Sequence, residues 1–204
     1  MAIAGSDPKA LLLEATMAYV AEHGVTDLTL RSLAPALNTS HRMLVYHFGS
    51  KEGLLVEVVR EVERRQRETL MRLEADGSLT LSEQIMRSWR RLADPAMWPH
   101  ERLFFEIYSH ALQGRTHAVR LLDDVVEAWL NPLTKVVARH GLSEADARAE
   151  ARLALAVTRG LLLDLLATRD SEGVERAMMR FVRGFEERVT RVAAVERPNN
   201  ARKA

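Results

Sequence analysis

The window from residue 28 to residue 51, LTLRSLAPALNTSHRMLVYHFGSK, contains cations and hydrogen-bonding side chains but no carboxylate. Arg31, Arg42 and Lys51 carry its positive charge, and Asp27 and Glu52 stand immediately outside it. The chain of 204 residues has a net charge of only +1, so the absence of acidic residues is a local feature. These side chains suit contacts to phosphate oxygens and base edges, and the window therefore predicts a surface for duplex DNA.

Two short helices and a polar turn must position these side chains. Leu30, Leu33 and Leu37 mark the first helix, and Ser40 is placed to cap a second one from His41 to about His47. The pattern is that of a helix-turn-helix, whose second helix enters the major groove. Pro35 is harmless if the first helix effectively begins at residue 32. It removes a backbone bond, at a cost of up to about 3 kcal/mol, if that helix begins at residue 29.

Nine residues in and beside this helical hairpin are candidate DNA contacts: Thr29, Thr39, Ser40, His41, Arg42, Met43, Tyr46, His47 and Lys51. Arg42 suits a bidentate contact to guanine, which is worth about 1–3 kcal/mol, and Met43 suits a thymine methyl group. Each candidate also has an ordinary structural role: the hydroxyls can cap helices, the aromatic rings can lie at the edge of the core, and the cations can be solvated.

Composition and periodicity predict an all-α fold of about nine helices: an N-terminal three-helix domain, which contains the helix-turn-helix, and a C-terminal helical bundle. The expected helices cover 7–24, 29–37, 41–47, 51–73, 80–94, 99–113, 117–140, 143–168 and 172–192, with Pro132 kinking or splitting the seventh. The expected divisions are a DNA-binding domain at 1–50, a ligand-binding and dimerisation domain at 51–195 and a disordered tail at 196–204.

Several classes of protein are disfavoured. The chain has no cysteine, its histidines lack the spacing of metal ligands, and no apolar run is long enough to span a membrane. The first residues lack the basic and apolar regions of a signal peptide, so we expect none. No phosphate loop, nucleophile elbow or HExxH motif is present. We therefore expect a cytoplasmic protein that is not an enzyme and that needs no metal or cofactor.

The first 55 or so residues resemble the TetR family of transcriptional regulators. The resemblance rests on LTLRSLA at 28–34, LNTS at 37–40 and YHFGSKE at 46–52, together with total length and helical character. It implies a ligand-responsive repressor that binds a palindromic operator, an inverted repeat, as a homodimer. Val45 stands where the family usually has a phosphate-binding tyrosine, and Tyr46 follows it by one residue.

For the second half, the resemblance implies a small-molecule pocket for an apolar or amphipathic effector. The candidate lining residues are Met86, Trp89, Arg90, Phe104, Phe105, Tyr108 and Trp129. Each of them could equally belong to an ordinary core. His100, Glu106 and His110 are possible polar anchors.

A homodimer interface is expected on two apolar segments near the C-terminus. The candidate contacts are Leu153, Val157, Gly160, Leu161, Val174, Met178, Phe181 and Phe185, which would form a four-helix bundle across a two-fold axis. The alternative is that both helices pack only within one chain. For the whole protein, the alternative function is a helical small-molecule-binding or adaptor module with a vestigial helix-turn-helix, and an enzyme is the weakest reading.

Overall fold

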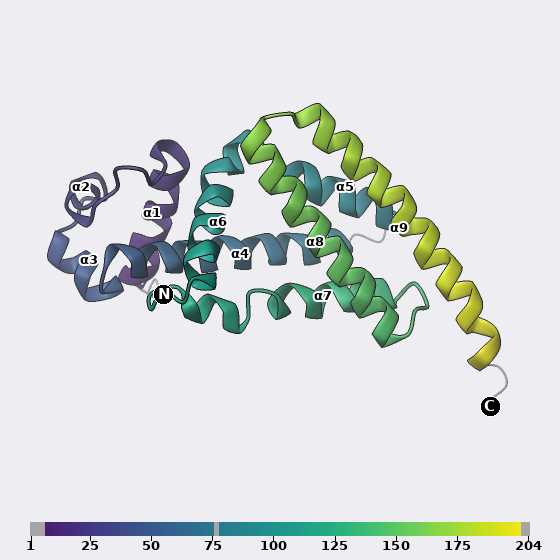
Figure 1. The fold of residues 1–204 in the computed structure, drawn as a ribbon. Helices are drawn as coiled ribbons and strands as arrows, with labels where there is room; N and C mark the ends of the chain where they lie inside the picture. Colours follow the sequence, from purple (N-terminus) through teal and green to yellow (C-terminus); the bar gives the residue numbers. More distant parts are fainter. Residues whose placement is uncertain (1–6, 76–77, 201–204) are drawn as a thin grey trace, which may run out of the picture. The chain divides into compact units, whose positions relative to one another are not determined.

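The computed structural model describes residues 7–75 and 78–200, which form nine α-helices and two short 3-10 helices, with no strand among them (Figure 1). The predicted all-α class is thus confirmed. Within these residues, no helix combines the length and the apolar character that crossing a membrane requires.

One packing unit contains the chain up to residue 65 together with residues 95–123. Its elements are α1 (Pro8–His23), α2 (Leu30–Ala36), α3 (His41–Phe48), the start of α4 (Lys51–Ala75), η1 (Pro95–Met97), α6 (Trp98–Leu112) and η2 (Val119–Asp123). Helix α2 packs against α3, and α1 packs against α6. The predicted boundary at residue 50 separates a DNA-binding domain from the rest by function, and it stays a prediction. Packing divides the chain differently, since it groups α6 with the first three helices.

The other unit contains residues 66–94 and the chain from residue 124 onward. Its elements are the rest of α4, α5 (Leu81–Leu92), α7 (Glu127–Ala138), α8 (Glu144–Thr168) and α9 (Ser171–Asn200). Helices α8 and α9 are joined by a short turn and run antiparallel (Figure 1). A core of this unit, to which α5, α7, α8 and α9 contribute, contains Leu81, Val136, Val137, Leu142, Ala147, Phe185 and Val189.

The helix expected over 117–140 is divided in two, and the break lies at residues 124–126 rather than at Pro132. Here the chain leaves one unit and enters the other, with Leu121 buried in the first and Val125 buried in the second. The carbonyl of Val125 accepts a hydrogen bond from Arg159 at 3.0 Å instead of from a helical N–H. Pro132 lies inside α7, which continues through it.

The C-terminal helix is longer than expected. Helix α9 continues to Asn200 and so includes five residues of the segment 196–204 that we expected to be disordered. Residues 201–204 lie outside the described residues.

Candidate nucleic-acid interface

A tight turn between α2 and α3 sets the geometry of the helical hairpin. Thr39 N–H donates to the carbonyl of Ala34 at 3.0 Å, and Asn38 N–H donates to the carbonyl of Pro35 at 3.1 Å. Asn38 has a φ of 50°, a left-handed conformation that asparagine tolerates better than most residues. The polar turn predicted at 38–39 therefore has a definite conformational role.

Thr29 and Ser40 cap the two helices of the hairpin. The Thr29 hydroxyl accepts from Ser32 N–H at 3.0 Å in a reciprocal capping box, and Ser40 Oγ accepts from Met43 N–H at 3.2 Å. Because α2 begins at Leu30, Pro35 is the sixth residue of this helix. Its missing N–H therefore removes one backbone hydrogen bond, at a cost of up to about 3 kcal/mol.

A small apolar core holds α1, α2 and α3 together. Its buried members are Met17, Val20, Leu33, Ala34, Leu44 and Phe48, as expected from their spacing. Two expected members differ: Leu37 is half-buried and Ala21 is exposed. Ala21 is exposed because it follows Val20 by one residue, roughly 100° around the helix, which turns it away from the core.

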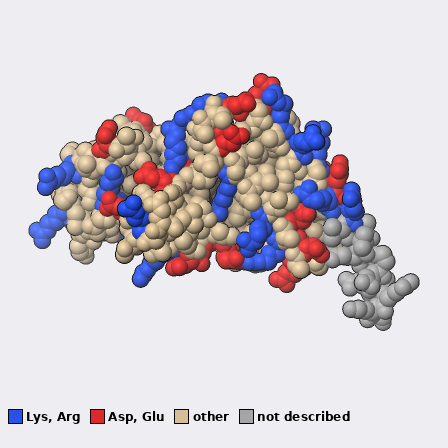
Figure 2. Space-filling model, in the orientation of Figure 1, with Lys and Arg blue, Asp and Glu red and all other residues tan. Residues whose placement is uncertain are grey.

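The core contacts leave one side of α3 open to solvent. His41, Arg42, Met43, Val45 and Tyr46 are exposed, and Tyr46 is the most open at 78%. Lys and Arg side chains project from the region of α2 and α3 at the left of Figure 2. The outward face of α3 thus combines a fixed cation, hydrogen-bonding groups and apolar surface, with no carboxylate on the helix.

Three further candidates are less accessible. Thr39 and Lys51 are half-buried, and Lys51 begins α4. His47 is also half-buried, and its Nε2 is buried without a hydrogen-bond partner. This atom of His47 cannot reach a phosphate in the observed conformation, because the ring turns toward the core beside Phe48, 6.2 Å away between centroids. The contact of His47 with phosphate stays a prediction, and a contact through Nε2 would require the ring to turn.

Ion pairs bind α1 to α4. Lys9 Nζ lies 3.1 Å from Glu57 Oε2, and Arg65 pairs with both Glu14 and Glu61. Hydrogen bonds from Arg64, and then from Arg65, lower the pKa of Glu61 to about 2, against the opposing effect of burial. The sequence did not reveal this network, because Glu14 is remote from Glu61 and Arg65 in the chain.

The junction between α3 and α4 contains a glycine that sequence reasoning did not single out. A Cβ at Gly53 would lie 2.3 Å from the carbonyl oxygen of Phe48. Ser50 Oγ accepts from Gly53 N–H at 3.0 Å. The close backbone approach fixes how α4 follows α3, and only glycine permits it.

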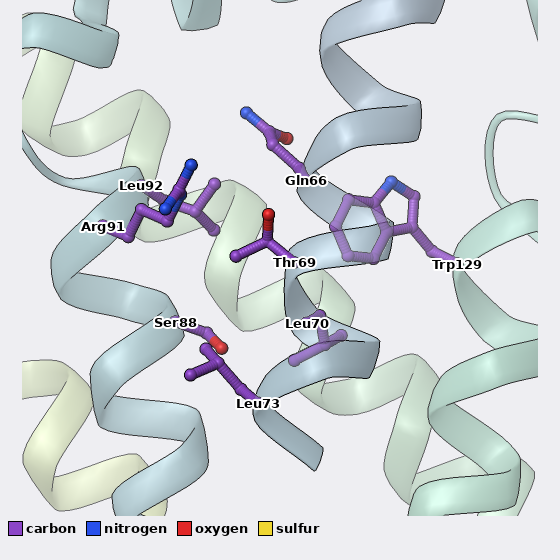
Figure 3. Close-up of a pocket in the computed structure, with 8 residues that line it drawn as sticks. All are labelled: Gln66, Thr69, Leu70, Leu73, Ser88, Arg91, Leu92 and Trp129. Atoms are coloured by element: carbon purple, nitrogen blue, oxygen red, sulfur yellow. The ribbon is translucent and has the colours of Figure 1, made fainter. Parts of the chain in front are cut away.

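In the second unit, a cavity of about 40 Å³ lies between α4, α5 and α7. Its lining residues are Gln66, Thr69, Leu70, Leu73, Ser88, Arg91, Leu92 and Trp129 (Figure 3). Ser88 Oγ is buried there without a hydrogen-bond partner. The Arg67 guanidinium lies 5.8 Å from the centroid of the Trp129 ring.

Only Trp129 of the seven predicted effector-pocket residues lines this cavity. The buried Trp89 instead donates through Nε1 to Glu175 Oε2 at 2.9 Å, and Arg90 Nε donates to Glu175 Oε1 at 2.9 Å. These contacts join α5 to α9, so the two residues have structural roles. Met86 lines an open surface groove, while Phe104, Phe105 and Tyr108 form an aromatic cluster on α6 in the other unit.

The possible polar anchors also belong to the first unit. His100 Nε2 lies 3.2 Å from the carbonyl oxygen of Met17, and burial lowers the pKa of His100. His110 Nδ1 lies 3.4 Å from Nε2 of His117. Glu106 is exposed. Among the described residues, no group of three or more His, Cys, Asp or Glu side chains is placed to hold a metal ion.

The predicted dimer residues fall into two groups. Val174, Met178 and Phe185 are buried within their own chain, and Phe185 belongs to the core of its own unit, so the place of these three residues in a dimer interface stays a prediction. On α8, Leu153 is 43% exposed and Gly160 is also exposed. Val157, Leu161 and Phe181 are half-buried.

A family model described as bacterial regulatory proteins, tetR family, matches residues 12–58. These residues include α2, α3 and the junction with α4. The HTH-type transcriptional regulator BetI from Stenotrophomonas maltophilia is 32% identical over 66 residues, which cover 32% of this chain and 34% of BetI. The chain thus spans about a third of the length of this curated relative.

Solved structures of regulators share the fold over most of the chain. A transcriptional regulator from Rhodococcus sp. Rha1 has a TM-score of 0.71 at 18% identity, with 89% of this chain and 97% of that chain covered. BioQ, solved with its natural double-stranded DNA operator, has a TM-score of 0.57 at 23% identity, with 87% and 98% covered. Residues 12–58 thus resemble the tetR family of bacterial regulatory proteins, and the solved structures show that the chain shares the fold of regulators.

Proposed function

We propose that this protein is a cytoplasmic, ligand-responsive transcriptional repressor that binds an inverted-repeat operator as a homodimer. The observation that carries the proposal is the exposed, carboxylate-free face of α3, which the core and the turn at Asn38 hold outward. Arg42 on this face can donate two hydrogen bonds to guanine, and the capped start of α3 points toward the bases in a helix-turn-helix complex. BioQ, which shares the fold, binds double-stranded DNA.

A second copy of the chain fits the exposed stripe of α8. Leu153, Ala156, Gly160, Leu163 and Ala167 are exposed and recur at alternating spacings of three and four, the repeat that packs helices side by side. Nothing lies within 4 Å of a Cβ built at Gly160, so its own chain does not require a glycine there. Glycine costs about 1 kcal/mol relative to alanine inside a helix, and close approach of a partner helix explains its use.

The cavity between α4, α5 and α7 is the proposed effector site. Leucines and Trp129 provide apolar surface, while Ser88, Gln66 and Arg91 provide polar groups, which suits an apolar or amphipathic molecule. A volume of about 40 Å³ is far below the roughly 300–1,000 Å³ of typical ligand pockets. An effector must therefore widen the site, and it does so by displacing the helices that line it.

Helix α4 connects this displacement to DNA binding. It begins at Lys51, directly after the α3 junction, and its residues 66–73 line the cavity. A bound effector that tilts α4 moves α3 relative to the groove. The coupling equals the difference in effector affinity between the two states, typically about 1–3 kcal/mol.

Selection of bound sequences from a random DNA pool with the full chain tests the proposal. We expect an inverted repeat whose half-sites are roughly 34 Å apart, and a slope of log K against log salt of very roughly −5 if three phosphates are neutralised per subunit. A reporter gene behind the selected operator should be transcribed less when the protein is present. Failure to enrich any sequence would refute the proposed function, and increased transcription would refute the repressor role.

The homodimer has its own test. Gly160→Glu places a charge in the α8 stripe and should give monomers in sedimentation equilibrium while helical content is unchanged. Gly160→Ala is the control for folding, because the added methyl group meets no atom of the same chain. A monomeric wild-type chain, or a Gly160→Glu variant that remains dimeric, would argue against this interface.

A further inference from the structure

Exposed apolar side chains are concentrated on α3. Among the described residues, the exposed large hydrophobic side chains number ten, and Met43, Val45 and Tyr46 account for three of them within four residues. Single exposed apolar residues need no explanation, but a group of them on one short helix marks a contact surface. Val45, at 39% exposure, has no assigned role in the proposed function so far.

The position of Val45 on α3 is fixed by its neighbours. At about 100° per residue, Val45 lies roughly 60° from Arg42 and roughly 160° from Met43 around the helix axis. It is therefore beside the arginine, on the flank away from Met43. The buried side of the helix is held by Leu44 and Phe48, so Val45 cannot rotate into the core without breaking that packing.

We propose that Val45 reads the C5-methyl group of a pyrimidine in the major groove, at a base pair beside the guanine contacted by Arg42. A branched aliphatic side chain has no hydrogen bond to offer, and the only apolar group on the major-groove edge is this methyl. The inference rests on the proposed function. It adds that each half-site contains a methyl-dependent position assigned to Val45 and separate from any position read by Met43.

Two bases carry a C5-methyl group in the major groove, thymine and 5-methylcytosine. They can be distinguished because the rest of the base pair differs while the methyl group is the same. Burial of one methyl-sized group corresponds to about a four-fold change in affinity, and to about fifteen-fold when both half-sites are changed.

The experiment uses the full-length chain and the operator obtained by selection. Each thymine is replaced in turn, in both half-sites, by deoxyuridine, which removes only the methyl group. We expect one position at which wild-type binding weakens about fifteen-fold and Val45→Ala binding does not change. At that position a C·G pair containing 5-methylcytosine should bind more tightly than the unmethylated pair, again only with Val45 present. Equal binding of the two C·G pairs would overturn the methyl assignment.

Val119→Ala is the matched control, since Val119 is 40% exposed and lies outside α3. It should retain the full dependence on the methyl group. The inference is overturned if every deoxyuridine position is neutral, if the operator contains no thymine, or if Val45→Ala keeps the wild-type dependence. All three outcomes leave specific DNA binding intact, so they differ from a failed selection, which would overturn the proposed function itself.

Discussion

Apolar and polar side chains are used in opposite ways on α3 and on α9. On α3 the core takes Leu44 and Phe48 and leaves a mixed face outward, so the exposed residues are free to meet a partner. On α9 the apolar stripe through Val174 and Met178 is used by its own unit. An apolar stripe by itself thus identifies a packing surface, whereas a partner is identified by the side chains that remain exposed.

Arg42→Ala is expected to have the largest effect on operator binding, because it removes the cation from the outward face of α3. Loss of a bidentate base contact in both subunits should weaken operator binding by about 2–6 kcal/mol, roughly 30-fold to 10⁴-fold. Fluorescence anisotropy with labelled operator measures the change. Arg102→Ala, at an exposed position on α6, is the control and should bind normally. Unchanged operator preference in Arg42→Ala would support a vestigial helix-turn-helix.

Gly53→Ala tests whether the α3–α4 junction is rigid. The added methyl group would lie 2.3 Å from the carbonyl oxygen of Phe48, so the backbone must shift. We expect a loss of about 1–3 kcal/mol in the free energy of unfolding and weaker operator binding as well. Denaturant titration and anisotropy measure the two effects. An alanine variant with wild-type values for both would show that the junction adjusts freely.

Trp89→Phe tests the hydrogen bond that joins α5 to α9 in the second unit. It removes the indole donor to Glu175 and should lower the free energy of unfolding by about 1–3 kcal/mol. Arg90→Ala removes the exposed partner of the same carboxylate and should cost less than about 1 kcal/mol. The reverse order, measured by urea denaturation, would contradict the structural role of Trp89.

Lowering the pH should reduce the stability of the first unit, because Glu61 becomes protonated and loses its charge. Its pKa is held at about 2 in the folded chain, mainly by Arg64, whereas the ordinary value is 4.5. Its contribution is therefore complete above about pH 4.5 and is lost as pH falls toward 2. Each 1 kcal/mol lost lowers the Tm by about 2–4 °C in a chain of this size. Glu61→Gln should flatten this part of the Tm–pH curve, and an unchanged curve would exclude the Arg64–Glu61–Arg65 network as its cause.

The helical hairpin of α2 and α3 could be predicted closely because its determinants are local. Thr29 and Ser40 cap the two helices of the hairpin, and the turn at Asn38 has the expected place. The missed contributors were Gly53 and the pairing of Glu14 with Arg65, since both depend on groups that meet only after folding.

The cavity proposed as the effector site and the surface proposed for the dimer could not be located from the sequence alone. Trp89 and Trp129 are equally aromatic in the sequence, yet one is hydrogen-bonded to α9 and the other lines the cavity. The cavity combines residues of α4, α5 and α7, and no spacing along the chain links those three helices.

The sequence by itself determined most of the helices, the caps of the hairpin and the outward face of α3, because capping and helical periodicity act over a few residues. The tertiary structure alone decided which apolar stripes are consumed within the chain and which remain open, as Phe185 and Leu163 illustrate. The physical reason is that burial of apolar surface is non-directional: a stripe gains the same free energy against its own chain as against another, so its neighbours must be known before its partner can be.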